Sequence, residues 1–369
     1  MKLRCGICII GREERIKTIR SQRDYQGKSS LHHLLSPAQS KMKTKSDVTP
    51  ASIPAAALKS SGRKIPLLGF GTAAFPNVDH EVTKAAVLGA IKLGYRHFDT
   101  ATLYHTEEPI GEAIAEAVSQ GLIKSREDLF ITTKLWCSDA HPGLVLPALK
   151  NSLKNIKLDY IDLYLIHWPV STKPGTSEFP MKKEHFMPMD FKAVWADMEE
   201  CQRKGLARSI GVSNFSCKKL SFILANAQIP PEVNQVEFNP LWQQKKLREF
   251  CEANGVLLTA YSVLGAVVSN GGSNKVMDCK QLKEIARAKG KTVAQICRRW
   301  AYEQGVCVLA KSFNKERMKE NLEIFDWELT EEESRKIDEI PQSRGYLGEE
   351  YISEHGPYRT FAELWDGGL

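Results

Sequence analysis

Residues 160–168 read YIDLYLIHW, and this stretch decides the fold class. Tyr160 to Ile166 is an almost continuous apolar run of strand length, and it ends at His167. A strand with one wet face alternates apolar and polar residues, whereas a run like this one is typical of a parallel strand that is covered on both faces. The sequence therefore predicts a buried parallel strand with a polar side chain at its carboxyl end.

The same rhythm of a short apolar run and an amphipathic stretch continues on both sides of this strand. Runs of strand length lie at 67–71, 97–99, 129–133, 160–166, 207–212, 233–236, 256–260 and 306–309. Stretches with apolar residues at helical spacing lie at 82–93, 110–117, 146–156, 191–198, 220–224, 247–251 and 293–301. Eight strand-length runs that alternate with such stretches within about 260 residues favour an α/β fold of the closed (β/α)8 TIM-barrel type over an open sheet. A polar helix at 331–340 and an irregular tail are predicted to follow.

The positive charge of the chain lies outside this repeating region. The net charge is +7, and residues 1–50 hold 11 Lys and Arg against 4 Asp and Glu. Residues 51–369 therefore carry 40 charges of each sign, which predicts no binding to nucleic acid or to a membrane. We expect 51–369 to form a single barrel domain and 1–50 to be a disordered or targeting extension, or a stretch ahead of a true start at Met42. The location is then cytoplasmic, or plastid if 1–41 are a transit peptide.

The cysteines predict neither a disulfide framework nor a metal site. Nine are spread along the chain, and an odd number in a chain of this length favours a reducing compartment. Cys5 and Cys8 form a Cys-x-x-Cys pair, but no second pair completes a zinc site. No apolar run approaches the ~20 residues of a membrane-spanning helix.

Polar residues gather at the carboxyl ends of the predicted strands. These ends carry Asp99, Lys134, His167, Ser213, Asn214, Gln235, Tyr261, Ser262, Lys311 and Ser312. Because active sites in (β/α)8 barrels are built at this edge, we expect these side chains to converge on one mouth. A single His or Asp after a strand is usually structural, whereas so many donors and titratable groups at one edge favour a functional site.

Several motifs in this region resemble those of the aldo-keto reductase family. They are Gly69-Phe-Gly71-Thr72, Asp99-Thr-Ala-x-x-Tyr104, Lys134-Leu-Trp136, Leu163-Tyr-Leu-Ile-His167-Trp168-Pro, Gly211-Val-Ser213-Asn214-Phe215, Asn234-Gln235-Val-Glu237 and Leu309-Ala-Lys311-Ser312 with Arg317 and Asn321. The resemblance spans about residues 57–369. Within the family the chain is similar to plant chalcone, codeinone and methylecgonone reductases, partly through the segments 199–205 and 361–365.

The resemblance implies that NADPH reduces an aldehyde or ketone to an alcohol. Tyr104 would donate the proton, Lys134 would lower the pKa of Tyr104, and Asp99 would hold Lys134 in place. His167 would donate a hydrogen bond to the carbonyl oxygen as negative charge builds there. Each residue also has a structural alternative: a buried ion pair for Asp99 and Lys134, a loop aromatic for Tyr104 and a core histidine for His167.

The resemblance also implies a cofactor site. Ser213, Asn214 and Gln235 would bind the nicotinamide carboxamide, and Tyr261 would stack on its ring. Lys311, Ser312 and Arg317 would surround the adenosine 2′-phosphate, with Glu320 and Asn321 near the adenine. The remaining expected contacts are Gly71, Thr72, Asp99, Ser262, Leu264 and Phe313. Two cations and a hydroxyl suit a dianionic phosphate that NAD lacks, so the cluster predicts NADPH.

The expected substrate is apolar, because aromatic residues lie near the predicted mouth. Trp136, His167 and Trp168 match substrate positions in the family, and Phe75, Pro76, the Trp242 region and the tail at 351–365 are further candidate walls. Such walls favour a cyclic or aryl-bearing carbonyl compound. Three departures from the family pattern are Thr106, Val263 and Ala310, and the loss of a proline at Val263 bears on the shape of the loop that would clasp the cofactor.

Three other interpretations are open at this point. Gly69-x-Gly71-x-x-Ala74 fits a loose dinucleotide fingerprint, but Asp99 lies about 30 residues beyond the first glycine instead of about 20, which disfavours a Rossmann dehydrogenase. A barrel that binds NADPH without catalysis would show no turnover with any carbonyl compound. A polyketide reductase in transient contact with a synthase would need that partner before it formed product. We expect a monomer otherwise.

Overall fold

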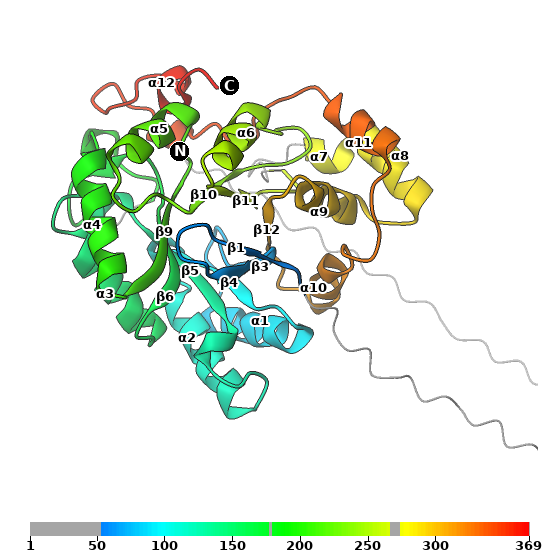
Figure 1. The fold of residues 1–369 in the computed structure, drawn as a ribbon, viewed down its shortest axis with the longest axis horizontal. Coiled ribbons are helices and arrows are strands. Elements are labelled where there is room, and N and C mark those ends of the chain that lie inside the picture. Colours follow the sequence, from blue (N-terminus) through cyan, green and yellow to red (C-terminus); the bar gives the residue numbers. More distant parts are fainter. Residues whose placement is uncertain (1–52, 177–178, 266–273, 369) are drawn as a thin grey trace, which may run out of the picture. The chain divides into compact units, whose positions relative to one another are not determined.

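The computed structural model describes residues 53–176, 179–265 and 274–368. Eight parallel strands form a closed barrel in chain order (Figure 1). They are β3 (Leu68–Gly71), β4 (His97–Asp99), β5 (Phe130–Leu135), β6 (Ile161–Ile166), β9 (Ala207–Ser213), β10 (Val233–Glu237), β11 (Leu257–Tyr261) and β12 (Cys307–Ala310). The last strand pairs with the first, because Leu309 lies opposite Gly69. The predicted barrel and all eight predicted strands are confirmed.

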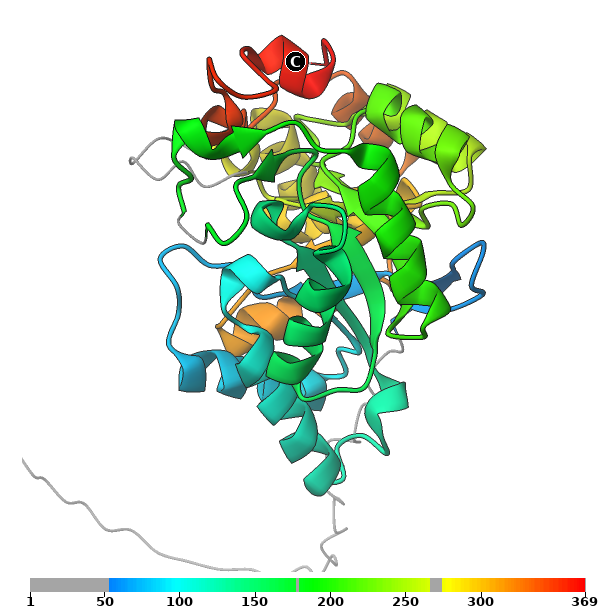
Figure 2. The same ribbon diagram turned by 90° about the vertical axis from the view of Figure 1, so that its left-hand side faces the viewer.

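Helices cover the outside of the barrel (Figures 1 and 2). They are α1 (His80–Leu93), α2 (Glu107–Ser119), α3 (Val145–Ile156), α4 (Phe191–Arg203), α5 (Cys217–Asn226), α6 (Lys245–Ala253), α7 (Lys275–Asp278), α8 (Lys280–Lys289), α9 (Val293–Glu303) and α10 (Lys315–Leu322). Local sequence fixes several starts: the Asp79 carboxylate accepts the first free N–H groups of α1, and Thr292 with Gln295 forms a capping box for α9. The structure describes no helix that is long and apolar enough to cross a membrane.

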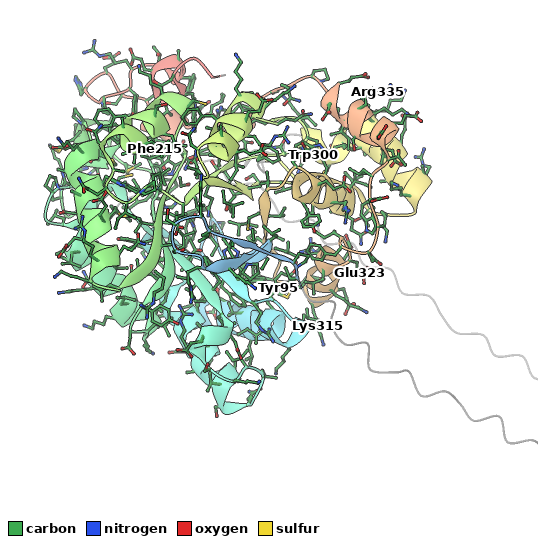
Figure 3. All side chains as sticks on the ribbon, viewed as in Figure 1. Tyr95, Phe215, Trp300, Lys315, Glu323 and Arg335 are labelled. Carbon is green, nitrogen blue, oxygen red and sulfur yellow. The ribbon has the colours of Figure 1, made fainter. Side chains whose placement is uncertain are left out.

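The main core lies between the strands and the surrounding helices. Every residue of β6 is buried, as its apolar run predicts. On the outer side of the barrel, Trp300 of α9 stacks on Phe238 with a centroid distance of 4.8 Å and an interplanar angle of 13° (Figure 3). Tyr95, which follows α1, donates a hydrogen bond to the carbonyl of Met318 at 2.9 Å and so ties α10 to the barrel.

A hairpin that the sequence did not predict closes the amino-terminal end of the barrel. It consists of β1 (Ala55–Ala57) and β2 (Lys64–Pro66). Its turn is held from the barrel, because the Glu232 carboxylate accepts the N–H groups of Ser60 and Ser61 at 2.7 Å each. Buried Leu58 and Ile65 fill this end from the hairpin side.

The tail after the barrel forms a second apolar cluster at the opposite end. After α11 (Glu331–Asp338), which packs on the main core through Ile337, the tail continues through a 3-10 turn (Glu349–Tyr351) and ends with α12 (Phe361–Trp365), which lies beside α5 in Figure 1. With it pack the loop after β6 and the short strands β7 (Ser171–Thr172) and β8 (Phe186–Met187). The cluster joins Trp136, Trp168, Phe186, Tyr351 and Trp365 among others. The predicted helix at 331–340 is present, whereas α12 and the β7–β8 pair had no clear sequence signal.

Gly111 of α2 lies in close contact with the end of α3. A Cβ there would lie 1.9 Å from the carbonyl oxygen of Ile156, a backbone atom at the end of α3. We expect Gly111→Ala to lower the free energy of unfolding by about 3 kcal/mol, because overpacking forces the backbone to move. Gly89→Ala on α1 is the matched control, since nothing lies within 4 Å of its Cβ position. Urea denaturation of both variants tests this, and equal stabilities would contradict it.

Candidate active site

The four predicted catalytic residues meet at the carboxyl end of the barrel. Asp99 ends β4, Lys134 lies near the end of β5, His167 follows β6, and Tyr104 lies in a 3-10 turn (Thr102–Tyr104) after β4. Lys134 is fully buried, and its Nζ donates to Asp99 Oδ1 at 2.6 Å and to the carbonyl of Thr100 at 2.8 Å. A buried ammonium needs such partners to offset its loss of hydration.

Tyr104 and His167 are joined directly. The Tyr104 hydroxyl lies 3.1 Å from His167 Nε2, and the two rings meet edge to face at 5.4 Å. Lys134 Nζ lies 4.9 Å from the centre of the Tyr104 ring. His167 Nδ1 is buried without a hydrogen-bond partner among the described residues. A phenol, an imidazole and an ion pair therefore share one site.

Burial decides the protonation states of this group. It raises the pKa of Tyr104 well above its ordinary value, and the negative charge of Asp99 adds to that effect. Burial lowers the pKa of His167 well below its ordinary value, and the charge of Lys134 acts in the same direction. Burial outweighs any lowering by Lys134, whose ammonium is paired with Asp99, so the pKa of Tyr104 lies above its ordinary value and not below it. Both shifts favour the neutral form of the side chain, the phenol of Tyr104 and the uncharged imidazole of His167.

A buried chain of hydroxyls supports the Asp99 end of the site. Thr106 Oγ1 lies 2.7 Å from both Thr72 Oγ1 and Thr100 Oγ1. Thr72 also donates to the carbonyl of Asp99 at 2.9 Å. Thr106 was noted only as a departure from the family pattern, yet it links the backbone on both sides of the ion pair. No local sequence signal predicts these contacts.

The residues predicted around the nicotinamide form one connected network. Gln235 Nε2 donates to Asp99 Oδ2 at 2.8 Å, and Ser213 Oγ donates to the carbonyl of Gln235 at 2.8 Å. Asn214 donates to the carbonyl of His167 at 3.0 Å and accepts from the Tyr261 hydroxyl at 2.7 Å. The residues predicted to bind the carboxamide are therefore directly hydrogen-bonded to Asp99 and His167, two of the four predicted catalytic residues.

Open space lies next to Gly71. This residue is buried at the end of β3, opposite Asp99, yet an added Cβ would meet no atom within 4 Å. A buried glycine that faces free space beside hydroxyl and amide groups fits the close approach of a flat, polar ring. Ser262 adopts a left-handed backbone conformation with φ of 50°, and both Ser262 and Leu264, in the loop after β11, are half-buried.

The predicted adenosine residues lie on the loop after β12 and on α10. Lys311 and Arg317 are exposed, Ser312 is buried and Phe313 packs against the main core. Glu320 accepts a hydrogen bond from Thr292 at 2.7 Å, and Asn321 is buried beside Tyr95. Two exposed cations close to a buried hydroxyl have the chemistry that a phosphate dianion requires. Of the two other departures from the family pattern, Val263 is buried and Ala310 continues β12.

Aromatic side chains stand beside the proton site. Trp136 meets His167 edge to face at 5.2 Å, and Phe75 meets Tyr104 at 6.3 Å. Phe179 joins them, at 5.3 Å from Phe75 and 6.1 Å from Trp136. Phe75 is 56% exposed and Phe179 is 38% exposed, so the two contacting rings form an exposed apolar surface next to Tyr104. Phe179 was missed, because a lone aromatic in a polar loop carries no pattern.

Trp168 has a different environment from Trp136. It is only 5% exposed and stacks on Tyr351 of the tail with centroids 4.1 Å apart. Trp365 meets it edge to face at 5.9 Å. Trp242, another candidate wall, lies under the Arg344 guanidinium at 4.6 Å from the ring centre. Trp168 and Trp242 both contact residues of the tail, so any role of these two side chains in substrate binding depends on the position of the tail.

Comparisons with known proteins agree with this arrangement. The model of the aldo/keto reductase family matches residues 67–342. The chain is 61% identical over 318 residues to 7-acetyl-epi-neemfruitin B aldo-keto reductase of Melia azedarach, covering 86% of this chain and 98% of that protein. It is 59% identical over 307 residues to NADPH-dependent codeinone reductase 1-4 of Papaver somniferum, covering 83% and 96%.

A solved structure shows the same likeness. The aldo-keto reductase of Bombyx mori, determined in complex with NADP, is 37% identical and aligns with a TM-score of 0.75 over 84% of this chain and all of that one. The family resemblance and the barrel class drawn from the sequence are thereby confirmed, and the Rossmann alternative is excluded by the closed barrel. The chain belongs to the aldo/keto reductase family and is an oxidoreductase.

Proposed function

We propose that this protein reduces an aldehyde or ketone group on an apolar, ring-bearing small molecule to an alcohol, with NADPH as the reductant. The observation that carries the proposal is the Tyr104 hydroxyl, which lies 3.1 Å from His167 Nε2 and beside the buried Asp99–Lys134 pair. When bound, NADPH supplies the hydride that the carbonyl carbon receives. The residues of the chain have to polarise the carbonyl and deliver the proton.

Tyr104 and His167 divide this task. The carbonyl oxygen takes its place within reach of both side chains, and neutral His167 donates an Nε2–H hydrogen bond to it. As the carbonyl oxygen gains negative charge, Tyr104 transfers its proton to that oxygen and becomes a phenolate. Lys134 stabilises the phenolate through its positive charge, and a proton from water restores the phenol. The raised pKa of Tyr104 favours the phenol, which is the form that carries the proton to be donated.

The cofactor would be held along one edge of the barrel mouth. Ser213, Asn214 and Gln235 would bind the carboxamide, and Tyr261 would cover the ring, next to the free space at Gly71. Lys311, Ser312 and Arg317 would bind the 2′-phosphate, with Phe313, Glu320 and Asn321 near the adenosine and Thr72, Ser262 and Leu264 along the rest of the path. The network that joins Gln235 to Asp99 supports this placement.

Arg317 should decide the preference for NADPH over NADH. We expect Arg317→Ala to reduce the ratio of kcat/KM for NADPH to that for NADH about tenfold or more, because a charge-assisted contact to the phosphate is lost. Lys315→Ala removes a positive charge from the same turn of α10 and is the matched control (Figure 3). Kinetics with both cofactors give the ratio, and an unchanged preference in Arg317→Ala would contradict the assignment.

The activity itself is tested by NADPH consumption with a panel of carbonyl compounds. The panel should contain aryl aldehydes, cyclic ketones and short aliphatic aldehydes, since Trp136, Phe75 and Phe179 favour apolar rings. Turnover with several ring compounds supports the proposal. Tight NADPH binding with no turnover on any of them would instead favour a binding role, and turnover only after addition of a polyketide synthase would favour the synthase-dependent alternative.

We further propose that the enzyme is a monomer in the cytoplasm and binds neither metal nor nucleic acid. The balance of charges in residues 51–369 supports the absence of a nucleic-acid partner. The residues proposed as a disordered or targeting extension, 1–50, lie outside the described residues, and so does Cys5-x-x-Cys8. Light scattering of the purified protein tests the monomer. Sequencing the mature amino terminus in the source tissue distinguishes a plastid transit peptide from an intact cytoplasmic extension.

A further inference from the structure

Glu237 is a buried carboxylate at the barrel mouth that the proposed chemistry does not use. It ends β10, two residues after Gln235, so the two side chains share a face of the strand. It is 1% exposed. One carboxylate oxygen accepts the N–H of Gly345 at 3.2 Å, and the other accepts the N–H of Tyr346 at 3.0 Å. A barrel strand thus holds two consecutive backbone groups of the tail.

The held segment forms part of the wall next to His167. The ring of Tyr346 lies 5.6 Å from Trp168, the residue that follows His167 in the chain. Tyr346 is therefore fixed at two points, by its backbone on Glu237 and by its ring on Trp168. Arg344 adds a third point, because its guanidinium lies 3.7 Å from the ring centre of Trp365, and its positive charge is near enough to interact with the Glu237 carboxylate.

Glu237 also adjoins the proposed cofactor ring site. It lies opposite Tyr261 in the pairing of β10 with β11. The next residue, Phe238, donates its N–H to the Tyr261 carbonyl at 3.2 Å, and the Tyr261 hydroxyl is bonded to Asn214. One strand end therefore holds the tail on one side and the residue proposed to cover the nicotinamide on the other.

We propose that Glu237 is a positioning residue that sets substrate affinity by holding tail residues 344–346 against the barrel mouth. It acts through Tyr346 and Trp168, which form the wall, and it makes no contact with the reacting atoms. The inference rests on the proposed reductase function for its kinetic readout. Its structural readout, the exposure of the tail, does not depend on turnover.

Glu237→Gln is the informative substitution because it preserves shape. Both carboxylate oxygens accept hydrogen bonds, whereas an amide has one oxygen and one NH2 group. In Glu237→Gln, the backbone N–H of either Gly345 or Tyr346 would therefore face the NH2 group of the new side chain, which is itself a donor and cannot accept a hydrogen bond. Glu237→Asp, which keeps both acceptors but shortens the side chain, is the second variant and should show a smaller change in the same direction.

The chain offers a matched control at the other end of the same strand. Glu232 is also 1% exposed, and one of its oxygens accepts the N–H groups of Ser60 and Ser61. Glu232→Gln thus disturbs the same chemistry in the hairpin that closes the amino-terminal end. It should lower the melting temperature without changing the kinetics.

The experiment compares Glu237→Gln and Glu232→Gln with the wild type. For Glu237→Gln we expect KM for an aryl or cyclic carbonyl compound to rise about tenfold, which corresponds to about 1.4 kcal/mol, with kcat within about twofold. The KM for a short aliphatic aldehyde, too small to reach the wall, should stay unchanged. Trypsin should cleave the tail at Arg344 and Arg359 faster than in the wild type or in Glu232→Gln.

Two results would overturn the inference. One is equal behaviour of the two variants in KM and in tail cleavage, which would make Glu237 a general stabilising residue. The other is an unchanged KM for the ring compound in Glu237→Gln despite faster cleavage, which would separate the tail from substrate binding. If Glu237→Gln does not fold, Glu237→Asp decides by the same measurements. If the wild type consumes no NADPH, the proposed function fails, while tail cleavage still reports on the hold that Glu237 exerts.

Discussion

Tyr104→Phe is expected to lower kcat for carbonyl reduction by about 10²–10⁴-fold, the range lost when a general acid is removed. The substitution deletes the hydroxyl that lies 3.1 Å from His167 and leaves the ring in place. In the variant no side-chain acid donates a proton to the carbonyl oxygen of the substrate as that oxygen gains negative charge. Only water can then supply the proton. NADPH affinity, measured by quenching of intrinsic fluorescence, should be unchanged, since the Tyr104 hydroxyl is not among the proposed cofactor contacts.

Tyr164→Phe is the control for this substitution. Tyr164 lies in β6 with its hydroxyl buried and unpartnered among the described residues, so its removal should cost neither activity nor stability. The assignment of Tyr104 as the general acid would be contradicted if Tyr104→Phe kept more than about a tenth of the wild-type kcat at saturating substrate.

Lys134→Met is expected to lower both activity and stability. It leaves the buried Asp99 carboxylate with Gln235 but without a counter-charge, and breaking a buried pair in this way costs about 3–5 kcal/mol. It also removes the charge that stabilises the Tyr104 phenolate, so we expect kcat to fall about 10²-fold or more. Urea denaturation and steady-state kinetics at saturating NADPH give the two values.

Lys219→Met separates the two effects of Lys134→Met. Lys219 of α5 is 8% exposed, and its Nζ lies 2.5 Å from Asp366 Oδ2, so it forms a comparable lysine–aspartate pair away from Tyr104. It should lose stability and keep kcat. If Lys134→Met is destabilised but retains kcat, the Asp99–Lys134 pair is structural, which was the alternative considered for it in the sequence.

The barrel was predictable because its signal is local and repeated. The run at 160–166 is apolar throughout since β6 is buried throughout, and the polar residue after each strand follows from the end at which active sites are built. The β1–β2 hairpin was not predictable, because Ala55–Ala57 has no strand pattern and its turn depends on Glu232, more than 170 residues away. Contacts between distant segments leave no periodic trace in a sequence.

The candidate site shows the same division. Asp99, Lys134, Tyr104 and His167 could be placed from their motifs, and the structure brings them together. The direction in which the pKa of Tyr104 shifts could not be predicted. It depends on how deeply the hydroxyl is buried and on the group with which Lys134 pairs. The ring contacts of Phe179 and the hydrogen bond between Thr106 and Thr72 could not be predicted for a related reason, because the partners lie far away in the sequence.

Residues 341–368 share an apolar cluster with Trp136, Trp168 and the loop after β6, and this cluster is distinct from the core of the barrel. Substitutions in the tail can therefore accumulate without disturbing the ion pair or the proton donor, which depend on the strands. Gene duplication followed by divergence in residues 341–368 and in the loop after β6 could produce enzymes with one shared chemistry and different substrates. In such a lineage the barrel sequence would change slowly and the tail sequence quickly. The rate of sequence change along the chain would then distinguish the residues that carry out the reaction from the residues that select the substrate.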